Sequence, residues 1–467
     1  MWLLFILLIS SVRTEDHECV ERKLRSVQLG VAFEKFKTDV VSFFKSSVIT
    51  IERRRKTIQK ALKKFINEAF GDDTIENTTP AKRLISGEKI YQDGNIEELV
   101  NSHGYNVEHH TVVTTDGYIL MVHRILPALL NETNFKSGTV LLHHGLLGSS
   151  DDWVLLGPKK SLPYLLVDAC YDVWLTNARG NKYSTGHITR TKEDGEFWKF
   201  SWNEIGQYDL SSVIDYIQNQ NDKVEQLHFI GHSMGCSALL ALLSTYPTYN
   251  QLLKSAVLLA PLAFMYEIKG PMRLLADFYN QHTQLSLQYL GDHDFVTLQN
   301  FPKNFLNKFC IGSEKLCSNP LLLLANGGQE ISNVTLKNNI LRNVPGGGSM
   351  RTIIHYIQLV KSGQFQMFDM GKSKNLKIYG RVSPPTYRLH DVTLPVALFT
   401  SSDDWLSTNR DVQSLLSNLP NPVIHHVVRR NEFSHTDFVW AEDADVLVYY
   451  LILDVIKLIS LGTTDMD

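Results

Sequence analysis

Cysteine is scarce in this chain, with five among 467 residues. At this length and 43% hydrophobic content the chain can build a large core or two domains, so it lies outside the small disulfide-rich class. Cys310 and Cys317 flank a short polar stretch, IGSEKL, and we predict a local disulfide between them. Cys170 and Cys236 lie in apolar context and are expected to pack as small hydrophobic side chains. The pattern leaves the state of Cys19 open.

Long apolar runs are also missing. The first ten residues, MWLLFILLIS, are apolar, but a bilayer span needs roughly 20 such residues. They are typical of a secretory signal peptide over residues 1–14, cleaved after Thr14, with a buried N-terminal helix as the alternative. A second run at 446–459 contains Asp454 and Lys457 and predicts a C-terminal helix packed on a core. We therefore expect no transmembrane span.

Motifs for metals, cofactors and nucleic acids are absent as well. The chain holds neither H-E-x-x-H nor C-x-x-C, and its adjacent histidine pairs would point to opposite faces of a strand. The glycines at 346–348 have no strand before them and no Lys-Ser/Thr after them, unlike a phosphate-binding loop. The net charge of −3 gives no reason to expect nucleic acid. We expect no metal and no cofactor.

Positive charge is concentrated near the N-terminus. Residues 20–70 hold thirteen Lys or Arg and five Asp or Glu, with apolar residues at helical spacing. We predict a basic helical extension over residues 15–90. Three interpretations stay open: a solvated helical hairpin, a segment attracted to anionic lipid, or a pro-segment cut at the arginines 53–55.

Three N-x-[ST] sequons, at Asn77, Asn131 and Asn333, agree with entry into the secretory route. Because such sequons also arise by chance, we expect glycan on about two of them. Together with the predicted signal peptide, they favour a secreted or lysosomal protein.

From residue 105 onward the pattern becomes that of an α/β protein. Asp116 and Gly117 separate two alternating segments and predict a hairpin. Short β-rich runs then recur between helical stretches, which is the rhythm of a mostly parallel sheet with helices on both faces. These runs are GTVLLHHGL, DVWLTN, QLHFIGHS, SAVLLAPL, PVALFTSSDD and VIHHVV.

The long interval from Leu262 to Asp391 interrupts that rhythm and is too long for a loop. We predict a mainly helical cap domain over 262–391, inserted between two parts of one core at 91–261 and 392–467. Leu321–Leu324 is a candidate lining for an acyl-chain channel, with plain cap core as the alternative.

The run LHFIGHSMGC at 227–236 ends an apolar strand on a serine held between two glycines. G-x-S-x-G is typical of a nucleophile elbow, a sharp turn that presents Ser233 at a helix N-terminus. A serine hydroxyl needs an imidazole to take its proton and an acid to orient that imidazole. On an α/β-hydrolase scaffold the order is serine, acid, histidine, and Asp404 and His435 satisfy it, with Asp403 competing as the acid.

A tetrahedral intermediate also needs hydrogen-bond donors for its oxyanion. The N–H of Met234, directly after the serine, is one candidate. The second is the N–H of Leu146, in the loop that follows GTVLLHH.

The chain resembles the acid lipase family, which includes lysosomal acid lipase and gastric lipase. The resemblance spans about residues 90 to 440 and is carried by TTDGYIL, HHGLLGSSDDWV, DVWLTNARGNKYS, FWKFSWNEIGQYDL, GHSMG, PPTY, SSDDWL and HTDFVW. The chain departs from the family pattern at Cys170, which stands where the family has the glycine of AGYDVW. The basic extension has no counterpart in the family pattern.

The resemblance implies an α/β-hydrolase core with a helical cap and hydrolysis of neutral lipid esters, triacylglycerol or sterol ester. It implies the triad Ser233, Asp404 and His435, because the DWL alignment favours Asp404 over Asp403. It further implies oxyanion donors at Leu146 and Met234, and a cap disulfide that Cys310 and Cys317 resemble.

We therefore predict a serine lipase that acts on a lipid ester at a lipid–water interface. Two alternatives are kept: a short-chain esterase or thioesterase with the same triad, and a non-enzymatic lipid carrier on the same fold. The sequence does not indicate the oligomeric state.

Overall fold

The computed structural model describes residues 96–127, 137–220, 226–281 and 331–462, together with 293–294, 319, 321–322 and 325. In these ranges no helix is long and apolar enough to cross a bilayer. Several predicted features lie outside the described residues: the signal peptide, the basic extension, Cys19, Asn77, Asn131, Cys310 and Cys317.

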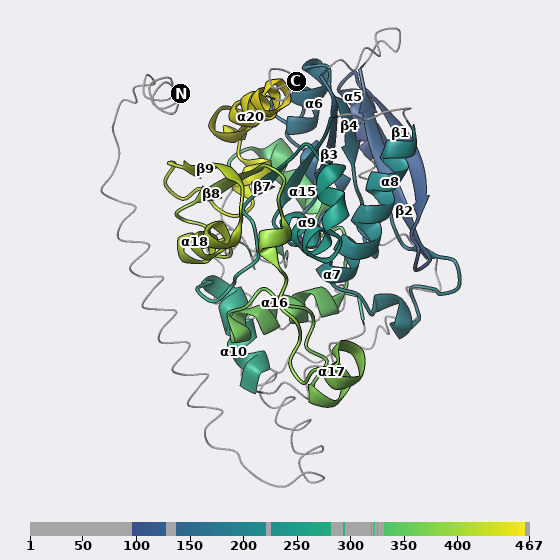
Figure 1. The fold of residues 1–467 in the computed structure, drawn as a ribbon. Coiled ribbons are helices and arrows are strands. Elements are labelled where there is room, and N and C mark those ends of the chain that lie inside the picture. The colour runs from purple at the N-terminus through teal and green to yellow at the C-terminus, as the bar shows by residue number, and fades with distance from the viewer. Residues whose placement is uncertain are drawn as a thin grey trace, which may run out of the picture. The chain divides into compact units, whose positions relative to one another are not determined.

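A nine-stranded sheet forms the centre of the described domain, in the order β1-β2-β4-β3-β6-β7-β8-β9 with β5 paired to β2 (Figure 1). The six strands from β4 to β9 along this order run parallel, and β1 and β2 are antiparallel. The predicted mostly parallel sheet and the hairpin at Asp116 and Gly117 are confirmed. The strands are β1 (Asn106–Val113), β2 (Tyr118–Leu126), β3 (Thr139–His143), β4 (Asp172–Leu175), β5 (Gly186–His187), β6 (Leu227–His232), β7 (Ser255–Leu259), β8 (Val396–Ser401) and β9 (Pro422–Val428).

Helices cover both faces of the sheet because its strands are apolar on both sides. Along β3, Leu141 belongs to one core cluster and Val140 and Leu142 to the other. One face packs against α7 (Trp202–Glu204), α8 (Ser211–Gln220), α9 (Met234–Thr245) and α18 (Asn409–Asn418). The other packs against α5 (Ile96–Ser102), α6 (Leu162–Asp168), α19 (Asp437–Trp440) and α20 (Tyr450–Leu461).

The predicted C-terminal helix is confirmed by α20, which follows a short π-helix at Asp445–Tyr449. Its side chains Ile452, Val455 and Ile456 are buried, so the apolar run at 446–459 packs on the core. A second π-helix, Ile205–Leu210, joins α7 to α8.

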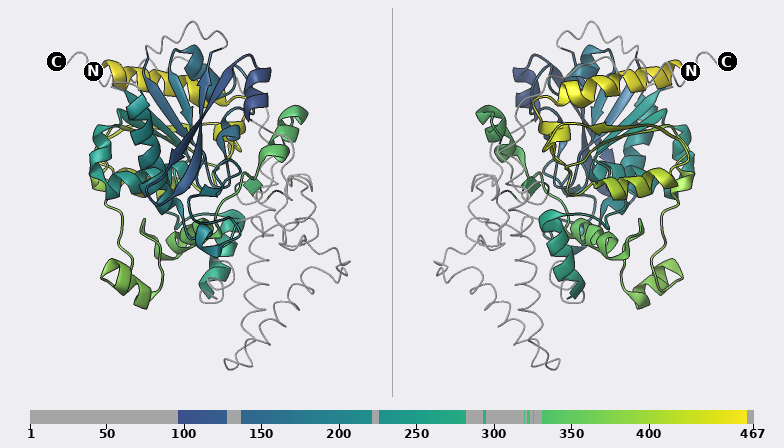
Figure 2. Two further views of the ribbon diagram at one scale, coloured as in Figure 1. Left: turned by 90° about the vertical axis from the view of Figure 1, so that its right-hand side faces the viewer. Right: turned by 90° about the vertical axis from the view of Figure 1, so that its left-hand side faces the viewer.

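The interval 262–391 contributes helices where it is described: α10 (Gly270–Gln281), α15 (Val334–Asn343), α16 (Met350–Ser362) and α17 (Lys372–Tyr379). Helices α10 and α16 pack against each other. Figure 2 shows α10, α16 and α17 beyond one end of the strands, with α20 near the opposite end. They lie at the ends of the parallel strands, where ligand sites of α/β folds are found.

The two described cysteines differ from each other. Cys236 is buried in α9 as predicted, but Cys170 is exposed, so that prediction was wrong. Cys170 follows the end of α6 with a left-handed backbone, φ 64°. Its N–H donates to the carbonyl of Val167 and the N–H of Tyr171 donates to that of Leu166, which is the Schellman pattern of helix termination. This turn directs the thiol to solvent.

Candidate active site

The strand β6 runs directly into α9 through Ser233, whose backbone has φ 53° and ψ −109°. Few residues other than glycine adopt this region, and such strain marks nucleophile elbows. Both flanking residues must be glycine, because a side chain at either position would clash with its neighbours. A Cβ at Gly231 would lie 2.7 Å from the Phe229 ring, and one at Gly235 would lie 2.6 Å from the carbonyl oxygen of His143. The tight turn leaves Ser233 at the N-terminus of α9.

Two loops bring partners to Ser233. His435 follows β9, and its Nε2 lies 2.8 Å from Ser233 Oγ. Asp404 follows β8, and its Oδ2 lies 2.8 Å from His435 Nδ1. Because the carboxylate accepts at Nδ1, that nitrogen carries the proton and Nε2 is free to accept one from the serine. All three side chains are buried.

Asp404 is held as a carboxylate by its surroundings. Burial alone would raise its pKa, but His435 and the N–H groups of Ser407 and Leu406 lower it below the usual value. Those N–H groups donate to Oδ1 at 2.9 and 2.8 Å. Asp403 instead is exposed and accepts from the N–H of Glu432 at 2.5 Å. The structure thus brings Asp404, and not Asp403, to His435.

The predicted oxyanion donors come from two segments beside the serine: Met234 directly follows it, and Leu146 lies in the loop after β3. Met234 is the first residue of α9, so no helical carbonyl is available to its N–H. The loop with Leu146 packs closely on the elbow, since a Cβ at Gly145 would lie 3.3 Å from Ser233 Cβ. Leu146 and Ser233 line the same pocket.

Two buried histidines hold these parts in place. His144 Nε2 accepts from the N–H of Ala178 at 3.1 Å, and its Nδ1 donates to the carbonyl of Gly145 at 2.7 Å. His232 Nε2 donates to the carbonyl of His435 at 2.9 Å. Burial lowers the pKa of each to about 3, so both rings are neutral. From sequence, His144 belongs to a histidine pair that is a poor metal ligand, and nothing in the motif patterns singled out His232. Their adjacency to Gly145 and Ser233 was the available signal.

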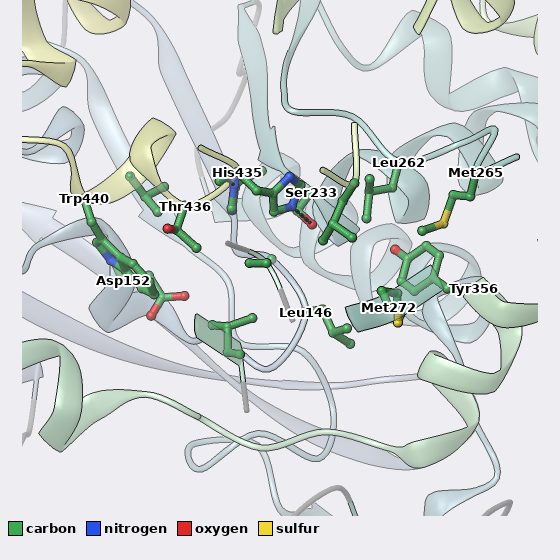
Figure 3. A pocket seen from close by; sticks show the side chains of 16 residues that line it. Leu146, Asp152, Ser233, Leu262, Met265, Met272, Tyr356, His435, Thr436 and Trp440 are labelled. Carbon is green, nitrogen blue, oxygen red and sulfur yellow. Dashed lines mark hydrogen bonds between the residues drawn. The ribbon is translucent and has the colours of Figure 1, made fainter. Parts of the chain in front are cut away.

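The pocket in front of Ser233 is mostly apolar. Figure 3 shows Met265, Met272 and Tyr356 on one side of Ser233 and His435, with Asp152, Thr436 and Trp440 on the other. Of the leucines proposed for an acyl channel, Leu321 lines this pocket and Leu322 is buried in the core. The other two lie outside the described residues.

Comparison with known proteins places this arrangement in a family. Residues 138–442 match the family described as alpha/beta hydrolase fold, and residues 96–157 match the partial alpha/beta-hydrolase lipase region. The chain is 34% identical to Lipase 1 of Drosophila melanogaster over 84% of its own length and 86% of that protein. It is 36% identical to the gastric triacylglycerol lipase of Bos taurus, over 76% of this chain and 89% of that one. The chain belongs to this family of lipases.

The resemblance to acid lipases and the α/β-hydrolase fold are thereby confirmed, and the protein is a carboxylic ester hydrolase. Lipase 3 of Drosophila melanogaster is a further relative, 36% identical over 75% of this chain and 90% of its own. The two matched regions begin at residue 96, beyond the basic extension.

One acid in the pocket of this lipase was not anticipated from sequence. Asp152 is buried, and its Oδ2 accepts from the N–H of Ser149 at 3.3 Å. Burial and the nearby charge of Asp151 raise the pKa of Asp152 to about 8, against the opposite effects of Ser149 and Lys182. Asp152 is therefore a neutral acid over most of the physiological range.

Proposed function

We propose that the protein is a serine lipase that cleaves neutral lipid esters, triacylglycerol or sterol ester, through an acyl-enzyme on Ser233. The 2.8 Å contact between Ser233 Oγ and His435 Nε2, at the wall of an apolar pocket, carries this proposal. Oγ attacks the ester carbonyl while His435 takes its proton. The protonated ring then gives that proton to the departing alkoxide.

Asp404 orients His435 and stabilises its positive charge during this step. The N–H groups of Leu146 and Met234 bind the oxyanion, each worth roughly 3 kcal/mol in the barrier. Water deprotonated by His435 next attacks the acyl-enzyme, and the fatty acid leaves as Ser233 regains its proton. The side of the pocket with Met265 and Met272 accepts the acyl chain, since flexible thioethers adapt to a long apolar ligand.

We also infer a secreted or lysosomal glycoprotein with a cleaved signal peptide at 1–14, a disulfide between Cys310 and Cys317, and a cap over 262–391. Asn333 supports the glycan assignment. It is exposed, and its Oδ1 caps α15 by accepting from the N–H of Leu336 at 3.0 Å, which leaves Nδ2 for a sugar. Asn77 and Asn131 are the other proposed acceptors.

Ester hydrolysis as a function of acyl length, from acetyl to stearoyl, tests the substrate class. Run at acidic and neutral pH with Ser233→Ala alongside, it should show long-chain activity that the variant lacks. Activity confined to short chains would indicate the esterase or thioesterase alternative. Folded protein that is inactive at every length would indicate the lipid carrier.

A further inference from the structure

Helix α17 and the turn after it present large aliphatic side chains to solvent. Leu376, Ile378 and Val382 are 55%, 57% and 57% exposed. Most exposed apolar residues on a soluble protein are isolated and need no explanation. These three lie within seven residues. Leu376 and Ile378 are two positions apart and so leave α17 on different sides, and Val382 lies in the turn after it. We call this exposed segment, residues 376–382, the α17 surface.

The same segment is strongly basic. Residues 370–384 contain Lys372, Lys374, Lys377 and Arg381 and no acidic residue, although the whole chain has a net charge of −3. All four basic residues are exposed. Apolar and cationic side chains are therefore interleaved on one element of an otherwise slightly acidic protein.

The α17 surface is held rigidly from beneath by Asn375, which is 1% exposed. Its Oδ1 accepts from the N–H of Met370 at 2.9 Å. Its Nδ2 donates to Asp369 at 2.7 Å and to the carbonyl of Val382 at 3.0 Å. These bonds tie α17 to the segments before and after it. Leu376 and Lys377, which follow Asn375, are therefore held in exposed positions.

The α17 surface lies on the pocket side of the molecule. Helices α10 and α16, which supply Met272 and Tyr356 to the pocket, lie at the same end of the strands as α17 (Figures 1 and 2). Helix α20 lies near the opposite end of the strands in both figures. A flat surface that touches α17 would therefore face the pocket side and not α20.

We propose that the α17 surface is an anchor that binds a lipid surface carrying anionic headgroups. The aliphatic side chains would enter the headgroup–acyl boundary while the lysines contact negative charge. Burial of apolar side chains and attraction to anionic headgroups both contribute to such binding. Lysine is depleted at protein–protein interfaces, so this composition favours lipid over an acidic protein. The proposal deepens the proposed function, because it states which lipid surfaces the pocket is brought to.

Flotation of the full chain with vesicles tests the anchor. Vesicles of phosphatidylcholine alone are compared with vesicles that also contain phosphatidylserine, at low and raised salt. The double variant Lys377→Gln/Ile378→Ser should bind the anionic vesicles about tenfold more weakly than the unmodified chain. The matched control is Lys457→Gln/Leu458→Ser on α20. It also replaces a lysine and an adjacent exposed aliphatic residue, but there Asp454 lies one turn away. It should bind as the unmodified chain does.

Two further measurements separate this anchor from catalysis. Hydrolysis of a water-soluble short-chain ester should be unchanged in the α17 variant, and Ser233→Ala should bind vesicles normally while hydrolysing nothing. Equal vesicle binding by the α17 variant and the unmodified chain would overturn the proposal, because the affinity would then come from another segment. An equal loss in the α20 control, or a matching loss of soluble-ester activity, would overturn it as well.

Discussion

Two clusters around buried charged side chains are built alike in this lipase, but only one borders the pocket at Ser233. In the first, Asp404 holds His435 beside Ser233. In the second, Arg179 is 1% exposed and lies between Asp209 and Asp116, with its Nε 2.7 Å from one carboxylate and its Nη1 2.6 Å from the other. In both, directional hydrogen bonds stabilise a buried ion. Two carboxylates surround Arg179, whereas Asp404 accepts from the His435 ring and from two backbone N–H groups.

The two clusters differ in whether a reactive group is left facing a pocket. The guanidinium of Arg179 lies 3.9 Å from the centre of the Tyr118 ring, and the carboxylates raise its pKa although burial alone would lower it. Arg179, Asp209 and Asp116 do not line the pocket at Ser233. The triad geometry instead leaves Ser233 in a pocket wall. We therefore expect the Arg179 cluster to stabilise the fold and the Asp404 cluster to prepare chemistry, because only the second borders the pocket at Ser233.

The largest expected effect is on the triad. Asp404→Asn should lower kcat by about 10⁴-fold, because an amide can donate to His435 Nδ1 and so favour the wrong tautomer. Steady-state hydrolysis of a soluble ester measures it, with thermal unfolding to show that the variant is folded. Asp403→Asn is the matched control and should retain near-normal kcat. A large loss of kcat in Asp403→Asn, with little loss in Asp404→Asn, would show that Asp403 and not Asp404 is the acid of the triad.

Substitution in the Arg179 cluster should lower stability and leave kcat nearly unchanged, the opposite of the effect expected at Asp404. Arg179→Met should lower the free energy of unfolding by about 3–5 kcal/mol, since it leaves Asp209 buried without its partner. Denaturant unfolding measures this. The activity per folded molecule should change by less than about twofold, because no member of this cluster lines the pocket. A fall in kcat with unchanged stability would erase the distinction between the clusters.

Asp152 should make stability depend on pH. Its pKa is about 8 in the folded protein against an ordinary value of 3.8, so the folded state binds a proton that the unfolded chain has lost. This group's contribution to stability therefore falls as pH rises from about 4 to about 8. Asp152→Asn should remove that slope and stabilise the protein at the upper end, by an amount on the order of a few kcal/mol. Unfolding curves across this range measure it, and an unchanged slope would contradict the assignment.

The smallest effect concerns Cys170. Cys170→Gly should raise the free energy of unfolding by about 0.5–1 kcal/mol, because glycine adopts φ 64° without the Cβ penalty. Cys170→Ala keeps that penalty and should leave stability nearly unchanged. If both variants were equally stabilised, the thiol and not the backbone would be responsible.

The strands and the elbow could be predicted because their signals are local. The apolar runs around Phe229 and Leu398 and the glycines beside Ser233 occupy neighbouring positions in the chain. The choice of Asp404 over Asp403 needed the family resemblance, since residue type alone does not separate two adjacent acids. In the structure, hydrogen bonds from Leu406 and Ser407 mark Asp404.

The missed features depend on contacts between distant segments. His144 acts through Ala178, and His232 through the backbone of His435, two hundred residues away in the chain. Asp152 is neutral because of what surrounds it in the folded protein. The context of Cys170 was apolar in sequence, but the helix end turned its side chain outward.

Covalent labelling tests the central claim most directly. The full chain, treated with a fluorophosphonate and digested, should yield a single modified peptide with the label on Ser233, and Ser233→Ala should yield none. Asp404→Asn should slow this labelling by orders of magnitude, whereas folded Arg179→Met should be labelled at the normal rate. Labelling at another serine, or none in folded and otherwise unmodified protein, would contradict it.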